Sequence, residues 1–123
     1  MNKPENKAKA SHASTKWQRS NPQQSVPYNR ANAAMVRVKR YYPEALHCNL
    51  TDTLPIYELA YQREVETGIR HHVDHRRPLM AGGIHHPSNF DVLTVEEHLE
   101  KTMAETRLIR MLMSEYYDIN HES

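Results

Sequence analysis

The stretch of residues 69–102 constrains the fold most, because strand-like runs, turns and a helix start follow one another closely there. The first run must end before Pro78, which cannot donate to a strand ladder. Thr94 and Glu97 form a capping box, the usual signature of a helix N-terminus. The predicted order is a strand within 69–75, turns at 82–83 and 87–89, a strand over 90–93, and a helix from Val95.

Helices are also predicted on both sides of this stretch. One begins near Thr53 and Leu54 and ends at Gly68, since Pro55 suits a first turn and glycine suits a helix end. Its inward stripe is predicted as Leu54, Tyr57, Tyr61 and Val65. After Val95 the chain contains no Gly or Pro, so it forms either one long helix or two helices with a bend near Thr102. Its apolar face is Val95, Leu99, Met103, Leu108, Leu112 and Tyr116.

The charge is distributed unevenly along the 123 residues, a length that suits one small domain. Residues 1–40 contain nine Lys or Arg and one acid, a net charge of +8, whereas the remainder carries −7. Residues 1–32 are rich in polar residues and Pro, so we expect a flexible basic arm, followed by a domain over 33–123. Residues 33–42 are read as a short strand or extended basic segment. This asymmetry favours a polyanionic partner such as nucleic acid, although a solubilising tail would show the same composition.

Other features exclude several classes of protein. No apolar run reaches the roughly 20 residues that a membrane-spanning helix needs, and no secretory signal is present, so we expect a cytoplasmic protein without a membrane partner. The single Cys48 forms neither an internal disulfide nor a zinc knuckle. Any metal ion must therefore be bound through His, Asp or Asn.

Three side chains in the central stretch can cleave a phosphodiester together. Asp74 and His98 offer a hard oxygen and a borderline nitrogen ligand, which suits one divalent cation, Mg²⁺ or Mn²⁺ first and Ni²⁺ or Zn²⁺ as alternatives. His75, with an ordinary pKa near neutrality, is the candidate general base. Asn89 can donate and accept hydrogen bonds at once, so it can fix either the loop backbone or the imidazole.

These residues resemble the HNH endonuclease family, and the segment before them resembles the leading helix of small phage-type members. The matching text is VDH at 73–75, PL at 78–79, GG at 82–83, PSN at 87–89, LT at 93–94 and EHLEKT at 97–102. Thirteen residues separate His75 from Asn89 and eight separate Asn89 from His98, as in that family. One departure is Arg76-Arg77, where the family more often has an apolar residue after the Asp-His pair. The likeness covers roughly residues 54–102.

The resemblance implies an α+β fold with a ββα-metal core over residues 69–102, an additional helix before it and a helical extension after it. It implies a DNA endonuclease in which Asp74 and His98 bind one metal ion, His75 is the base and Asn89 orients the site. Duplex or branched DNA would be nicked, or cut through both strands if two subunits act together, so the protein is expected to be a monomer or homodimer. The candidate nucleic-acid contacts are Arg37, Lys39, Arg40, Arg76, Arg77 and Lys101.

Several alternatives stay open at this point. Arg76 is either a phosphate clamp or a salt-bridge partner, and Lys101 either neutralises a phosphate or is simply solvated. Some of the remaining histidines (His71, His72, His85 and His86) could instead bind a structural zinc ion, or His85 and His86 could line the DNA groove. At the level of function, the rivals are a non-catalytic DNA-binding or regulatory module with the same fold and a small helical interaction protein.

Overall fold

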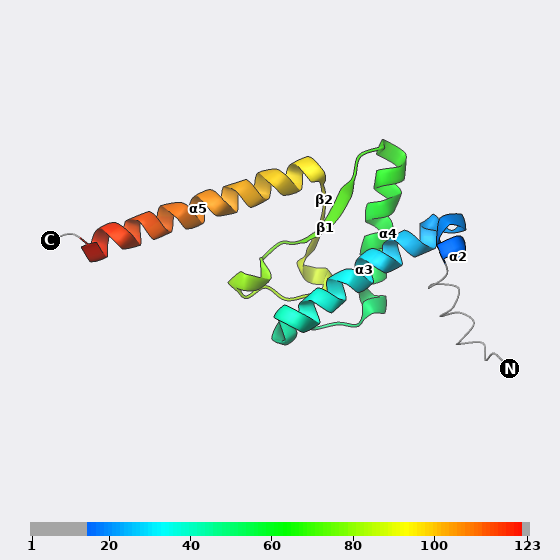
Figure 1. The fold of residues 1–123 in the computed structure, drawn as a ribbon, viewed down its shortest axis with the longest axis horizontal. Helices are drawn as coiled ribbons and strands as arrows, with labels where there is room; N and C mark the ends of the chain where they lie inside the picture. Colours follow the sequence, from blue (N-terminus) through cyan, green and yellow to red (C-terminus); the bar gives the residue numbers. More distant parts are fainter. Residues whose placement is uncertain (1–14, 122–123) are drawn as a thin grey trace.

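The computed structural model describes residues 15–121, in which helices flank a two-stranded antiparallel sheet (Figure 1). The fold is therefore α+β. Residues 1–14, which belong to the expected flexible arm, lie outside the described residues. The elements are α2 (Thr15–Ser20), α3 (Pro22–Tyr41), η1 (Pro43–Ala45), α4 (Leu50–Thr67), β1 (His71–His75), η2 (Leu79–Ala81), η3 (Pro87–Asn89), β2 (Phe90–Thr94) and α5 (Val95–His121).

Helix α3 corrects two expectations from the sequence. The flexible arm is wrong for residues 15–32, which form α2 and the first half of α3. The strand or extended segment over 33–42 is wrong because α3 continues to Tyr41. The expected domain boundary at residue 32 falls inside α3, between two residues of the core, Ala31 and Ala34. The buried positions Ala31, Ala34, Met35 and Val38 follow helical spacing. Small side chains let α3 lie close against α4, and this tertiary burial outweighs the polar, proline-rich composition.

Helix α4 begins three residues earlier than predicted, at Leu50, where the Asp52 carboxylate accepts a hydrogen bond from the backbone N–H of Asn49 (2.9 Å). As expected, it ends at Gly68. The φ of this glycine is 73°, a left-handed conformation that glycine adopts without strain. Its inward residues are Thr53, Tyr57 and Ala60. Val65 was predicted to face inward, but it is 65% exposed, and the buried residues of α4 all precede it in the helix.

The strands β1 and β2 form a hairpin with one face toward the core and the other toward α5. They pair with His71 opposite Thr94 and His75 opposite Phe90, close to the predicted hairpin. Because side chains alternate along a strand, Val73 packs on the core cluster, whereas Asp74 reaches α5 on the other side. The core cluster consists of Ala31 and Ala34 from α3, Tyr57 from α4 and Phe90 from β2.

Helix α5 is one continuous helix, which settles the choice that the sequence left open. The capping box at its start is present, with hydrogen bonds from Thr94 N to Glu97 Oε1 (2.9 Å) and from Glu97 N to Thr94 Oγ1 (3.1 Å). Its first turns contact β1 and β2, and the rest extends away from the other elements (Figure 1). Its predicted apolar face, including Leu99, Met103 and Leu112, is therefore exposed. Among residues 15–121 no helix combines the length and apolar character that crossing a lipid bilayer requires.

The burial of α3 can be tested with two adjacent residues. Ala31 is fully buried, so Ala31→Glu should place a charge in the core and lower the free energy of unfolding by about 3 kcal/mol or more. Asn32→Glu changes the exposed neighbour and should alter stability by less than about 0.5 kcal/mol. Urea unfolding followed by circular dichroism measures both. Equal stability of the two variants would contradict the burial of Ala31 and favour a flexible arm over residues 15–32.

Candidate active site

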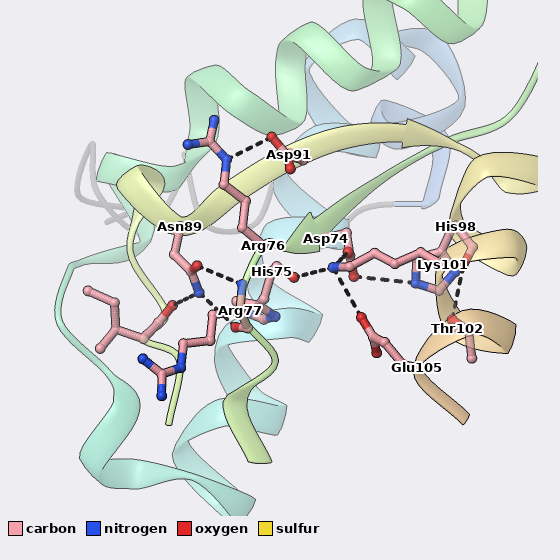
Figure 2. Close-up of polar contacts among 11 residues, drawn as sticks. Asp74, His75, Arg76, Arg77, Asn89, Asp91, His98, Lys101, Thr102 and Glu105 are labelled. Carbon is pink, nitrogen blue, oxygen red and sulfur yellow. Dashed lines mark hydrogen bonds and ion pairs between the residues drawn. The ribbon is translucent and has the colours of Figure 1, made fainter. Parts of the chain in front are cut away.

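The candidate site lies where the end of β1 meets the first turns of α5. Asp74 comes from β1 and His98 from α5, and Asp74 Oδ1 lies 3.5 Å from His98 Nε2 (Figure 2). The Asp74 side chain is 17% exposed and that of His98 42%, so both are reachable from solvent. The stacked ring of His72, with centroids 5.3 Å apart, supports the His98 ring. The two residues predicted as metal ligands therefore converge although 24 positions separate them in the chain.

Lys101 occupies the other side of the Asp74 carboxylate. Its ammonium donates to Asp74 Oδ2 and to the carbonyl oxygen of His75, the latter at 2.6 Å (Figure 2). Glu105, one turn later on α5, lies 3.6 Å from the same ammonium. Lys101 is thus a partner of the candidate metal ligand and not a solvated lysine. It lines a hollow of about 250 Å³ together with Tyr42, Asp74, His75, Pro78, Leu79, Met80 and Glu105.

His75, the candidate base, is half-buried and lines the same hollow. Its Nε2 lies 2.9 Å from Nδ1 of His85, and its ring packs against that of Phe90 in a T-shaped arrangement. Burial lowers the pKa of His75, an effect that the Asp74 carboxylate opposes and that the Lys101 and Arg37 charges reinforce. His75 is therefore neutral at physiological pH, which is the form that a general base needs.

Asn89 fixes the loop between the strands. Its side-chain amide donates to the carbonyl oxygens of Arg77 (3.0 Å) and Ile84 (2.8 Å), while its Oδ1 accepts from the backbone N–H of Arg77 (3.0 Å). Of the two roles predicted for it, the structure shows the one on the loop backbone. Gly83 is required in the same loop, because a Cβ there would lie 1.9 Å from the Arg77 carbonyl oxygen.

The residues predicted to contact nucleic acid divide into separate groups. Arg76 pairs with Asp91 at 2.8 Å, the salt-bridge alternative, and Arg77 donates to the Ala81 carbonyl oxygen at 2.8 Å. Both have exposed side chains beside the site. Arg37, Lys39 and Arg40 are exposed on α3, where Arg37 lines a second, smaller hollow that His75 also borders, and Arg40 stacks on Tyr41. Their binding to nucleic acid stays a prediction.

The remaining histidines each have other contacts in the structure. His71 Nδ1 contacts the Ile69 carbonyl oxygen, His72 stacks on His98, and His86 Nδ1 contacts the Ser88 hydroxyl. His85 is fully buried, so it cannot line a DNA groove as the sequence suggested. Within residues 15–121 no group of three or more His, Cys, Asp or Glu side chains is placed to hold a metal ion.

The pair of Asp74 and His98 fits one divalent cation as two of its ligands. Atoms bound to the same cation at about 2.1 Å and at angles of about 90–110° lie about 3.0–3.5 Å apart. The separation of 3.5 Å between Asp74 Oδ1 and His98 Nε2 agrees with this range. Two protein ligands suit Mg²⁺ or Mn²⁺ in particular, because such ions retain waters and bind phosphate oxygens at their other positions.

Two members of the site were missed or undervalued by sequence reasoning. Lys101 lies three residues after His98, so both face the same side of α5, and this spacing could have revealed its contact with Asp74. The contact between His75 and His85 left no signal, because His85 belongs to a loop whose path depends on tertiary contacts.

Comparison with known proteins adds no relative. A scan of protein-family models found no family that matches the chain, and searches of curated proteins and of solved structures found no significant match. The likeness to HNH endonucleases therefore rests on the residues quoted above and stays a prediction.

The loop-fixing role of Asn89 can be tested with a nearly isosteric change. Asn89→Asp keeps the acceptor but removes both donors, and it places a carboxylate against two carbonyl oxygens. We expect the free energy of unfolding to fall by about 2–3 kcal/mol, measured by urea titration. The matched change Asn32→Asp, on the exposed face of α3, should cost less than about 0.5 kcal/mol. Equal small effects would show that the loop does not depend on the Asn89 amide.

The burial of His85 should make stability depend on pH. Burial, with smaller contributions from the His75 and Arg37 charges, lowers the pKa of His85 to about 4, whereas the unfolded chain binds the proton at an ordinary pKa near 6.5. Between these values the unfolded state binds more protons, so stability is lost as the pH falls from about 6.5 toward 4.

The contribution of His85 is measured as a difference between variants. The free energy of unfolding of the wild-type protein should fall by about 1–2 kcal/mol more than that of His85→Phe between pH 7 and pH 5. His86→Phe, at the neighbouring and more exposed position, should follow the wild-type protein. If the free energy of unfolding of the wild-type protein and that of His85→Phe changed equally with pH, the lowered pKa of His85 would be contradicted.

Proposed function

We propose that this protein is a metal-dependent DNA endonuclease of the HNH type, in which β1, the intervening loop, β2 and the start of α5 form a ββα-metal core. The observation that carries the proposal is the convergence of Asp74 and His98, 3.5 Å apart, beside the half-buried His75. When bound by Asp74 and His98, one divalent cation supplies positive charge for the phosphate and the leaving oxygen.

Each residue of the proposed site has a separate task. His75 takes a proton from the attacking water through Nδ1, which has no hydrogen-bond partner among the described residues, since its Nε2 is held by His85. Asn89 holds the loop that carries His85, through its bond to the Ile84 carbonyl oxygen. Lys101 keeps the Asp74 carboxylate in place through its contacts with Asp74 Oδ2 and His75 O. Exposed arginines beside the site and on α3 contact the DNA backbone.

One observation favours a second candidate, the non-catalytic DNA-binding module. The Lys101 ammonium neutralises Asp74 directly, so the charges at this position balance within the protein itself. In such a module the strand end and α5 would be held together by this ion pair, and the exposed arginines would bind DNA without cleavage. Binding would weaken as salt rises, because each neutralised phosphate releases counterions.

Nicking of supercoiled plasmid in Mg²⁺ or Mn²⁺ separates the two candidates. The wild-type protein should convert plasmid to the open circular form, and excess EDTA should stop it. His75→Ala should reduce the rate by about 10²- to 10⁴-fold, the usual contribution of a general base. His47→Ala, which removes an exposed histidine, should leave the rate unchanged.

The same variants define the contrary outcomes. Equal rates for His75→Ala and His47→Ala would contradict the assignment of the base and indicate another source of cleavage. Binding of DNA without nicking by the wild-type protein, in either metal, would favour the second candidate. Circular dichroism of each variant verifies that it is folded.

A further inference from the structure

His85 places a polar ring in the protein interior beside the candidate site. The residue is fully buried, and its ring packs on Phe90 with centroids 5.0 Å apart. Its Nδ1 lies 2.9 Å from Nε2 of His75, while its own Nε2 is buried without a hydrogen-bond partner among the described residues. Unpaired buried nitrogen atoms are rare in folded proteins and invite a functional explanation.

The backbone of His85 is fixed from the far side. Its N–H donates to the Ala45 carbonyl oxygen (2.7 Å), and its own carbonyl oxygen accepts from the His47 N–H (3.3 Å) and the Cys48 thiol (3.2 Å). These bonds join the loop between the strands to the segment before α4. The His85 ring therefore has a set position, and it can determine how the His75 ring lies.

Counting protons restricts the arrangement of this pair. Two neutral imidazoles carry two N–H groups, and the contact between His75 Nε2 and His85 Nδ1 uses one of them. If His85 donates, His75 must carry its proton on Nδ1 and has no free lone pair for a water. If His75 donates, its Nδ1 is free to accept a proton, and none of the described residues forms a hydrogen bond with that atom. Only the second arrangement allows His75 to act as a base.

We infer that His85 is a positioning residue that accepts a hydrogen bond from the Nε2–H of His75 and thereby leaves His75 Nδ1 as the proton-accepting nitrogen. The inference rests on the proposed function, because it concerns the base of that reaction. In this arrangement the buried Nε2 of His85 carries the proton, and none of the described residues accepts a hydrogen bond from it. The inferred arrangement therefore leaves one buried N–H unsatisfied, a cost that the hydrogen bond from His75 must offset.

Two substitutions at His85 separate this role from a merely structural one. His85→Phe keeps a buried ring beside Phe90 but removes the acceptor and the unpaired N–H. His85→Asn keeps an oxygen acceptor near the position of Nδ1 but leaves a cavity. We therefore expect His85→Phe to keep or raise the melting temperature and lower the nicking rate about 10- to 100-fold. His85→Asn should do the reverse, with a lower melting temperature and a nicking rate closer to that of the wild-type protein.

The tautomer itself is read by nitrogen-15 NMR of the full chain at pH 8 in EDTA, which does not depend on activity. Wild-type His75 should show the Nε2–H form, His85→Asn should retain it, and His85→Phe should shift it toward the Nδ1–H form or a mixture. His86→Phe serves as the control, because His86 contacts Ser88 and not His75. A wild-type His75 protonated on Nδ1, or a tautomer unchanged by His85→Phe, would overturn the inference.

Failure of the proposed function gives a different pattern. If NMR shows the Nε2–H tautomer in the wild-type protein and its loss in His85→Phe, but no variant nicks plasmid, the hydrogen bond is supported and the proposed nuclease function is refuted. If a folded His85→Phe variant nicks plasmid at the wild-type rate, the nuclease function is supported and the positioning role of His85 is refuted.

Discussion

The burial of Phe90 between the helices and the two histidines is the contact on which the rest of the site depends. Phe90 is 4% exposed, meets Tyr57 of the core edge to face, and contacts the rings of both His75 and His85. It also lies opposite His75 in the strand register. The same side chain thus joins the hydrophobic core to the candidate base, so a well-packed core is needed for a well-placed imidazole.

The opposite face of β1 shows how a small protein holds a charged side chain at the edge of its core. Asp74 is mostly shielded from solvent, and an isolated carboxylate there would be costly. Lys101 and His98 approach its two oxygens from consecutive turns of α5, and the capping box at Thr94 and Glu97 fixes where that helix begins. A change in the start of α5 would therefore move both partners of Asp74 together.

Elements with local signals were predictable from the sequence. The capping box at Thr94 and Glu97, the glycine end of α4 and the turns around the hairpin depend on neighbours within a few residues, and the structure shows each of them close to its expected place. Helix α3 was not predictable in the same way. Ala31 and Ala34 are inward only because α4 packs on them, and a composition rich in Pro and polar residues concealed that burial.

The convergence of Asp74 and His98 was predictable from the spacing of strand, loop and helix, whereas the partner of His75 was not. His85 reaches His75 because hydrogen bonds to Ala45 and from Cys48 determine the path of its loop, and neither residue is near it in sequence. Local rules also fail at this point, since the His85 ring is fully buried and its Nε2 has no hydrogen-bond partner within residues 15–121. In natural sequences such exceptions to local rules occur mainly at functional or strained sites, which is why His85 is the position on which the proposed positioning role is placed.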